Sequence, residues 1–409
     1  MEEVVKPANL KVALQRVKRN KGCPGIDGMT VEELPGWLWA NWERLREELL
    51  VGSYQPCAVR REAIPKPGGG ERELGIPTVV DRFIQQALLQ VLQPRFDPHF
   101  SEHSYGFRPG RRAHDAVRRA QRYVQAGRRW VVDIDLARFF DRVNHDVLMG
   151  RLARRIADRR VLGLIRRFLD AGIMASGVVI ERHEGTPQGG PLSPLLANVL
   201  LDEVDKELER RGHAFVRYAD DCNVYVRSAK AGRRVFAGLR RLYAGLRLEV
   251  NEAKSAVDRA VRRQFLGFSF WIAAEGRIKL RVASQALGAM KAKVRELSNR
   301  NRGRRLARVV GELREYLLGW REYFKPADTP RAFHDLDQWI RHRLRCLQLK
   351  QWKRGTTVFR ELRVRGMTVT TAAQVAAQTR RWWHTSALTL NLALPNPYFD
   401  RLGLPRLAP

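Results

Sequence analysis

The sequence has few cysteines and no long apolar run. The four cysteines lie far apart in the chain and form no C-x-x-C pair: Cys23, Cys57, Cys222 and Cys346. This spacing argues against a zinc knuckle and a disulfide framework, and it fits a reducing cytoplasm. No run of about 18 apolar residues occurs, and the acidic start (Glu2, Glu3) is the opposite of a signal peptide. We therefore expect a soluble, cytoplasmic protein without a membrane partner.

Acidic residues are also scarce relative to basic ones. The 409 residues include 43 Asp and Glu against 75 Lys and Arg, a formal net charge of +32. A compact body with this surplus repels itself unless a polyanion neutralises it, and nucleic acid is the commonest such partner. A merely solvated basic surface is the alternative interpretation. A membrane surface fits less well, because no helical segment shows a Lys/Arg face opposite a Trp/Phe face.

Hydrophobic periodicity outlines the first two thirds of the chain. A hydrophobic fraction of 44% is enough for a sizeable core, and the length allows two or three domains of about 100–200 residues. β-branched and aromatic runs predict strands at 130–135 and 214–226, the second as two short strands with a turn at an Asp pair. Helices are expected in 1–50, 80–93, 143–170 and 193–211.

The last third of the chain differs from the rest in its hydrophobic pattern and its charge. Residues 277–409 contain 28 Lys and Arg against nine Asp and Glu, a net of +19. Apolar stripes at helical spacing predict three helices, over 287–297, 306–317 and 336–347. A helical and strongly basic module is suited to gripping the backbone of a nucleic-acid duplex.

The Asp pair at 220 and 221 is the strongest chemical signal. Adjacent carboxylates at a tight turn between apolar strands repel each other and lose solvation, so they are costly without a cation. Most Asp-Asp doublets are surface turns, and that alternative stays open for the doublet alone. The apolar flanks, Phe215-Val216 before it and Val224-Tyr225 after it, make a surface turn a poorer interpretation.

A second carboxylate site ends the earlier strand. Asp133 and Asp135 alternate, so on a strand they point to the same face, and Phe139 and Phe140 follow. Together with the later Asp pair, this strand end supplies the three carboxylates of a two-metal phosphoryl-transfer site. Magnesium suits such oxygen ligands. The reaction would be attack of a primer 3′-hydroxyl on the α-phosphorus of a nucleotide, with pyrophosphate leaving.

The order of these motifs resembles that of reverse transcriptases, specifically the class encoded by bacterial group II introns. The matching stretches are, in chain order, Gly25–Gly28, Ile64–Pro67, Leu74–Arg82, Ser104–Gly110, Asp135–Asp141, Gly185–Pro194, Tyr218–Asp221 and Phe265–Phe268. Leu318-Gly319-Trp320 followed by Tyr323-Phe324 resembles the start of the maturase, or thumb, region. The resemblance covers roughly residues 8–355.

The resemblance implies an α+β right-hand polymerase, with an antiparallel palm sheet packed on helices. Residues 1–275 would form fingers and palm with an N-terminal extension, and 276–355 a helical, maturase-like thumb. Residues 356–409 would be a short basic, DNA-binding-like segment. The chain has no clustered His and Cys ligands after the thumb, so we expect no endonuclease, as in the compact class-C intron proteins.

The resemblance also implies roles for individual residues. Asp135, Asp220 and Asp221 would be the catalytic residues and the ligands of two Mg²⁺ ions, with Mn²⁺ as a substitute. Asp133 would be an outer neighbour of the metals or an ordinary strand residue. Phe140 would act as a ribose gate that disfavours a 2′-hydroxyl, whereas Phe139 is expected in the core.

Further residues are implied to contact the nucleotide and the primer. Lys66 and Arg72 would bind the nucleotide phosphates, and Gln188 the incoming sugar. Leu266 and Gly267 resemble the primer grip. Lys254 lies where related polymerases place a general acid near the pyrophosphate, although a solvated Lys at a helix start is an equal alternative.

The expected function is RNA-directed DNA polymerisation. The partners would be an RNA template, a DNA or RNA primer, dNTPs and the host group II intron RNA, with binding of that RNA assisting splicing and retrohoming. One alternative is an RNA-binding splicing factor with a silent polymerase site. Another is a polymerase domesticated for phage defence or DNA repair.

Overall fold

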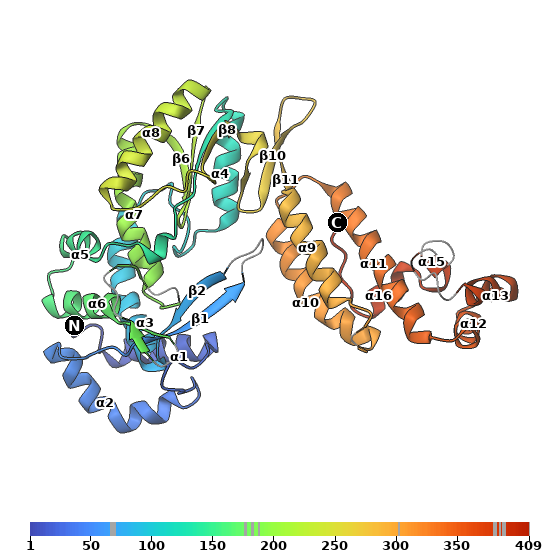
Figure 1. The fold of residues 1–409 in the computed structure, drawn as a ribbon, viewed down its shortest axis with the longest axis horizontal. Coiled ribbons are helices and arrows are strands. Elements are labelled where there is room, and N and C mark those ends of the chain that lie inside the picture. The colour runs from blue at the N-terminus through green and yellow to red at the C-terminus, as the bar shows by residue number, and fades with distance from the viewer. Residues whose placement is uncertain are drawn as a thin grey trace. The chain divides into compact units, whose positions relative to one another are not determined.

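The chain folds into two compact units, Met1–Arg263 and Gln264–Pro409. Figure 1 shows their elements in a computed structural model. The structure describes residues 1–65, 71–175, 178–180, 184–186, 189–301, 303–378, 383, 386 and 390–408. Lys66 and Gln188, two of the expected nucleotide contacts, lie outside these residues.

The N-terminal part of the first unit is built on helices. The expected helices are confirmed as α1 (Pro7–Asn20), α2 (Leu34–Val51) and α3 (Val79–Phe96). Helix α3 begins at a Thr78 cap, whose hydroxyl accepts the Asp81 N–H at 3.1 Å, and it is buried along much of its length. It therefore forms the centre of the packing here, against α1 in particular.

A small sheet follows, in the order β2-β1-β4-β5. Strands β1 (Val59–Pro65) and β2 (Glu71–Ile76) form an antiparallel hairpin. Strand β4 (Ile173–Ala175) joins β1 in parallel, and β5 (Val178–Ile180) pairs with β4. The residue pairs of the hairpin end with Pro65 opposite Glu71, at the two sides of the Gly-rich segment.

The main sheet of the first unit has the order β6-β7-β3-β8, and all of its pairings are antiparallel. The strands expected from sequence are confirmed as β3 (Trp130–Ile134), β6 (Ala214–Tyr218) and β7 (Asp221–Val226). The fourth strand is β8 (Ala256–Arg259). This arrangement is the antiparallel palm sheet of the expected α+β fold.

Helices cover both faces of the palm sheet. Helix α8 (Ala229–Gly245) packs so closely on one face that a Cβ at Gly232 would lie 2.4 Å from Val257 and 3.5 Å from Val226. Helix α4 (Ala113–Gln125) packs on the opposite face, where the Tyr123 and Tyr225 rings are 5.9 Å apart. The strand alternation thus separates an apolar face from a face that also carries Asp133 and Asp221.

Three more helices complete the first unit. The segment 143–170 forms two helices rather than one, α5 (His145–Ala153) and α6 (Arg159–Asp170). Asp158 separates them, because its carboxylate caps α6 by accepting the Arg160 N–H at 2.9 Å. Helix α7 (Ser193–Arg210) is almost continuously buried and packs against α3, α5 and β6.

The second unit is a small sheet followed by helices. Its strands are β9 (Gln264–Phe265), β10 (Phe268–Ile272) and β11 (Ile278–Val282), in the order β11-β10-β9. The three helices expected from the apolar stripes are confirmed as α9 (Ser284–Leu297), α10 (Leu306–Phe324) and α11 (Pro330–Trp352). The other helices among the described residues of this unit are α12 (Gly355–Val364), α13 (Val369–Ala377), α15 (Leu390–Ala393) and α16 (Asn396–Arg401).

The border between the units falls after Arg263, earlier than the expected border at 275. Aromatic packing is the physical reason. The Phe268 ring on β10 lies 5.8 Å from the Tyr323 ring and 5.1 Å from the Phe324 ring, both on α10. The Tyr323 hydroxyl also donates to the Leu266 carbonyl at 3.0 Å. The hairpin therefore belongs with the helices that follow it.

No described helix combines the length and the apolar character that crossing a bilayer requires.

Asp81 is a buried carboxylate at the start of α3 and is only 1% exposed. It accepts hydrogen bonds from the Tyr54 hydroxyl at 2.8 Å, the Thr78 hydroxyl at 2.7 Å and the Cys57 N–H at 3.2 Å. Burial nevertheless raises the pKa of Asp81 from 3.8 to about 6. The folded state thus binds this proton more tightly than the unfolded state, so the raised pKa makes stability fall as pH rises through this window.

We expect Asp81→Asn to remove this pH dependence. The free energy of unfolding of the wild type, measured relative to Asp81→Asn, should fall by about 2 kcal/mol between about pH 4.5 and pH 7. Urea unfolding of both proteins across this range measures the difference. Two parallel stability curves would contradict the assignment, whatever constant offset separates them.

Candidate active site

Strand register brings the predicted catalytic carboxylates into adjacent segments. Ile134 at the end of β3 pairs with Cys222 on β7, and continuing the register by one residue sets Asp135 beside Asp221. Tyr218 pairs with Asp221 across β6 and β7, so Ala219 and Asp220 form the turn between them. Two chain segments 85 residues apart in sequence thus meet at one end of the palm sheet.

Asp133 lies one step back on the same face, with Asn223 as its partner on β7. Its carboxylate accepts two hydrogen bonds from Arg263, at 2.6 Å and 2.9 Å. Burial raises the pKa of Asp133, and the Arg263 guanidinium opposes this rise. Next to it, the Asn223 side-chain oxygen is buried without a hydrogen-bond partner among the described residues. This face therefore carries more acceptors than the described side chains satisfy.

The carboxylates repel one another. The pKa of Asp221 rises from 3.8 to about 7, first because the surrounding protein desolvates the carboxyl group, although the residue is exposed at the end of β7, and then because Asp220, Asp133 and Asp135 lie nearby. Oxygen ligands with excess negative charge fit a hard divalent cation. Among the described residues, however, no three acidic, His or Cys side chains already converge as a metal cage. The assignment of Asp135, Asp220 and Asp221 as metal ligands thus stays a prediction.

A loop before β8 holds Asp135 through its backbone. The Asp135 N–H donates to the Ser255 hydroxyl at 3.0 Å, and the Ser255 hydroxyl donates to the Asp135 carbonyl at 3.3 Å. The Asn251 N–H donates to the same carbonyl at 2.8 Å. Lys254 lies in this loop, in a turn rather than at a helix start. Its ammonium is 3.8 Å from the Asp135 carboxylate, and its side chain is 71% exposed.

The two phenylalanines after the strand have different environments. Phe139 is 3% exposed and belongs to the core, as expected. Phe140 is half-buried and lines a cavity of about 480 Å³, together with Phe107, Arg82 and Gly190. The Phe140 carbonyl accepts the Thr186 N–H at 2.6 Å. Phe140, the predicted ribose gate, therefore borders this cavity, whereas Phe139 is enclosed in the core.

The described residues of the loop 185–190 lie against the hairpin formed by β1 and β2. A Cβ at Gly189 would be 2.8 Å from the Gly75 carbonyl at the end of β2, and Gly189 has φ +143°. The Arg72 backbone pairs with Ile64 on this hairpin, but its side chain is outside what the structure describes. Of the predicted phosphate and sugar contacts, Lys66 and Gln188 also lie outside the described residues.

The predicted primer grip forms a tight turn in the second unit. Leu266 and Gly267 connect β9 to β10 with φ angles of +50° and +76°. The Gly267 carbonyl accepts the Ala283 N–H at 2.9 Å, and a Cβ at Gly267 would lie 3.1 Å from the Phe324 ring. A glycine is needed here because both the backbone angle and the aromatic ring exclude a side chain.

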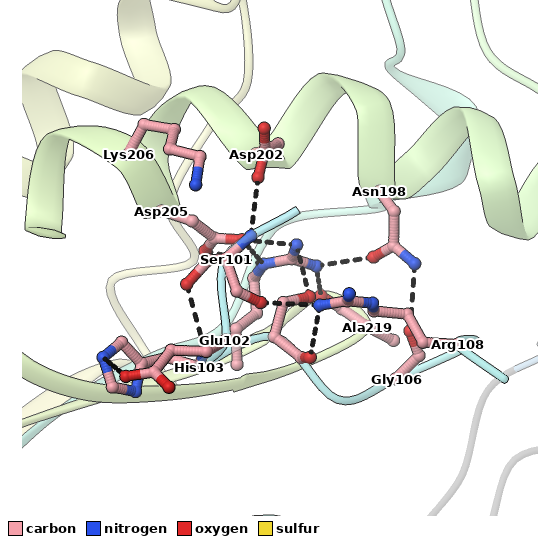
Figure 2. A network of polar contacts seen from close by, with 12 residues as sticks. Ser101, Glu102, His103, Gly106, Arg108, Asn198, Asp202, Asp205, Lys206 and Ala219 are labelled. Carbon is pink, nitrogen blue, oxygen red and sulfur yellow. Dashed lines mark hydrogen bonds and ion pairs between the residues drawn. The ribbon is translucent and has the colours of Figure 1, made fainter. Parts of the chain in front are cut away.

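Sequence reasoning missed a buried polar network beside the Asp pair. Arg217 on β6 is fully buried and forms an ion pair with Asp205 on α7 at 2.6 Å. Asn198, also on α7, accepts from Arg217 and donates to the Gly106 carbonyl. Figure 2 shows Asn198 and Gly106 near Ala219, with Asp205 on the other side of the network. The available signal was an Arg in the middle of an otherwise apolar strand.

Comparison with known families gives two matches along the chain. The family described as "Reverse transcriptase (RNA-dependent DNA polymerase)" matches residues 64–270. The family described as "Group II intron, maturase-specific domain" matches residues 287–366. The first match contains the whole palm sheet, and the second contains most of α9 to α12.

Individual relatives match the central part of the chain. Protein YkfC of Escherichia coli (strain K12) is 39% identical over 214 residues, which are 51% of this chain and 56% of that protein. Group II intron-encoded protein LtrA of Lactococcus lactis subsp. cremoris is 37% identical over 204 residues, 50% of this chain and 34% of that protein. The chain thus matches between a third and a little over half of these relatives' length. A chain in a solved structure of a partial Cas6-RT-Cas1–Cas2 complex is 27% identical, with a TM-score of 0.38. The match covers 59% of this chain and 41% of that chain.

We expect Arg263→Met to destabilise the first unit by about 1–3 kcal/mol, because it leaves the Asp133 carboxylate unpaired near two others. Asp133→Asn in the same protein should restore part of this loss. Urea unfolding measures both effects. The neighbouring Arg262→Met is the control, because Arg262 is 73% exposed and its contact with Asp258 is 3.8 Å long. Equal losses for the two Arg variants would contradict the assignment.

Proposed function

This chain belongs to the reverse transcriptase family, and we propose that it is an RNA-directed DNA polymerase of the group II intron type. It would add dNTPs to the 3′-hydroxyl of a DNA or RNA primer on an RNA template. The observation that supports this most is the register that sets Asp135 beside Asp221, directly after the Asp220 turn. No structural need of the sheet explains carboxylates gathered at this point.

Reverse transcriptases use divalent metal ions, and we propose two Mg²⁺ ions here, with Mn²⁺ as a substitute. Asp135, Asp220 and Asp221 would hold them, and the ions would stabilise the attacking and leaving oxygens of the transfer. Positive charge at this place would also offset the repulsion that raises the pKa of Asp221. The buried, unpartnered oxygen of Asn223 supports the same assignment, since it adds an acceptor to this face.

Lys254 would act beside these carboxylates. Its ammonium lies 3.8 Å from Asp135, so it can reach the region where pyrophosphate leaves and donate a proton there. Its high exposure keeps the solvated alternative open. Lys66, Arg72 and Gln188 remain the proposed contacts for the triphosphate and sugar. Leu266 and Gly267 remain the proposed primer grip.

The second unit supports an additional role in binding intron RNA. Residues 287–366 match the maturase-specific family, and residues 277–409 carry a net charge of +19. Three cations lie over the Trp339 ring, Lys291 and Arg295 from α9 and Arg343 from α11. A basic helical surface with this charge fits a phosphate backbone. We propose that this unit binds the host intron RNA and thereby assists splicing and retrohoming.

Primer extension on an RNA template with dNTPs and Mg²⁺ tests the polymerase. The wild type should extend the primer, and Asp220→Ala combined with Asp221→Ala should reduce the rate by at least about 1,000-fold, because the metals lose two of three ligands. Asp258→Ala is the matched control, since this carboxylate lies on β8 of the same sheet but outside the Asp pair. It should extend at close to the wild-type rate.

Binding of the RNA template must be measured beside extension. If all variants bind RNA and only the double variant fails to extend, the two-metal assignment holds. If the wild type binds RNA tightly but extends no primer, the chain is an RNA-binding splicing factor and the polymerase proposal is wrong.

Phe140→Ala tests the ribose gate. Removing the ring that lines the cavity makes room for a 2′-hydroxyl, so selectivity for dNTPs over rNTPs should drop by at least about 10-fold. Steady-state incorporation of matched dNTP and rNTP pairs measures the ratio. Phe139→Leu is the control, because Phe139 lies in the core; it should lower stability and leave the ratio unchanged. A changed ratio in Phe139→Leu alone would refute the gate.

A further inference from the structure

Arg217 is the largest fully buried side chain among the residues that the structure describes, and its charge is paired inside the first unit. Its Nε donates to both carboxylate oxygens of Asp205 at 2.9 Å, and one terminal nitrogen donates to Asp205 at 2.6 Å. Asp205 is itself fully buried. Burying a charge is costly unless the pairing geometry is good and the remaining donors are satisfied, so the other contacts of Arg217 have to be considered.

The remaining donors of Arg217 reach the turn that carries Asp220. Nη1 donates to the Ala219 carbonyl at 2.8 Å and to the Asn198 side-chain oxygen at 2.9 Å. Nη2 donates to the Ser104 hydroxyl at 2.8 Å. The guanidinium thus links a carboxylate on α7 to the peptide bond that joins Ala219 to Asp220. Only a planar group with several donors in fixed directions can make all these bonds at once.

A second segment supports the turn from the other side. Residues 103–105 run beside β6, where Arg217 N–H donates to the His103 carbonyl and Tyr105 N–H donates to the Arg217 carbonyl, both at 2.9 Å. Gly106 follows directly, and a Cβ there would lie 2.1 Å from the Ala219 nitrogen. Asn198 donates to the Gly106 carbonyl at 2.9 Å, so the same α7 residue binds both sides (Figure 2).

Arg108 anchors this segment. It is 7% exposed, and it donates to the Asp97 carboxylate at 2.8 Å and to the Ser101 and Ser104 carbonyls at 2.6 Å and 3.0 Å. The support for the turn is therefore itself held by a partly buried ion pair, and it is not a loose loop.

The turn needs this support because its backbone is strained. Ala219 has φ +57°, in the left-handed region that a side chain disfavours, and it is only 8% exposed. Such a conformation persists only where the surroundings over-determine it, and strained residues of this kind cluster at functional sites. Here Arg217 holds the carbonyl of Ala219, and Gly106 packs against its nitrogen.

We propose that Arg217 is a positioning residue for the divalent-cation site: by holding the Ala219 carbonyl, it presents Asp220 and Asp221 in one fixed orientation. The inference rests on the proposed polymerase function and adds a residue that touches neither nucleotide nor metal. Asp205 and Asn198 fix the guanidinium, and Gly106 closes the other side of the turn.

Two variants perturb the turn in independent ways. Arg217→Lys keeps the charge next to Asp205 but removes the fork that also reaches Ala219. Gly106→Ala leaves the ion pair intact and places a methyl group where the Ala219 nitrogen lies. Leu148→Ala is the control for general destabilisation, because it removes a fully buried side chain on α5. Melting temperatures identify conditions in which all the proteins are folded.

Two readouts separate positioning from a merely structural role. The first is the Mg²⁺ concentration that gives half-maximal primer extension, which should rise by about 10-fold in both turn variants. The second is amide hydrogen exchange of the segment 215–224 without metal or substrate. Exchange at the turn should accelerate by about 10-fold in both variants. Leu148→Ala should lower the melting temperature without either change.

The outcomes are distinct. If Arg217→Lys lowers the melting temperature but leaves both the Mg²⁺ requirement and exchange at the turn unchanged, Arg217 only stabilises the fold and the inference is wrong. If the wild type fails to extend primers, the proposed function fails, and exchange at the turn still decides whether Arg217 holds it. Faster exchange in Leu148→Ala that matches the turn variants would also overturn the inference.

Discussion

The first unit is organised around the repulsion between carboxylates that share one end of a largely buried sheet. Asp133, Asp135, Asp220 and Asp221 come from two segments of the chain, and desolvation and mutual repulsion together raise the pKa of Asp221 to about 7. A sheet gains nothing by gathering such groups. Some neighbouring segments supply a compensating charge and others fix the backbone that carries the carboxylates, and these are the two demands that the site makes on the fold.

Different parts of the fold meet these demands. Arg263 neutralises Asp133, the loop at 251–255 binds the backbone of Asp135, and the buried pair of Arg217 and Asp205 reaches the turn before Asp220. The contacts of Asp133 with Arg263 and of Asp135 with Ser255 join residues 130 and 120 positions apart, whereas Arg217 lies 12 positions from Asp205 and two from Ala219. The palm sheet thus acts as a rigid frame, and the chemistry depends on side chains that are held from outside the sheet.

The local sequence pattern predicted the strands and helices better than the contacts that hold the carboxylates in place. The strands β3, β6 and β7 follow from β-branched and aromatic runs, and the three long helices of the second unit from apolar stripes, because both signals repeat within a few residues. The separation of a core Phe139 from a cavity-lining Phe140 followed from the resemblance. The network of Arg217 could not be predicted, since its partners Ser104, Asn198 and Asp205 are brought together only by the fold. The border after Arg263 reflects aromatic packing of Phe268 on α10, which leaves no local sequence signal.

The short connection between β6 and β7 also limits how this protein can evolve. Side chains on a strand alternate between faces, so one residue added between Tyr218 and Asp221 would reverse every later position of β7. Asp221 and Asn223 would then enter the apolar layer under α8, and Cys222 and Val224 would move to the face on which α4 packs. A substitution on β7 changes a single side chain, whereas a change in the length of this loop moves every later side chain of β7 to the other face of the sheet. Homologous chains should therefore keep the number of residues in this hairpin.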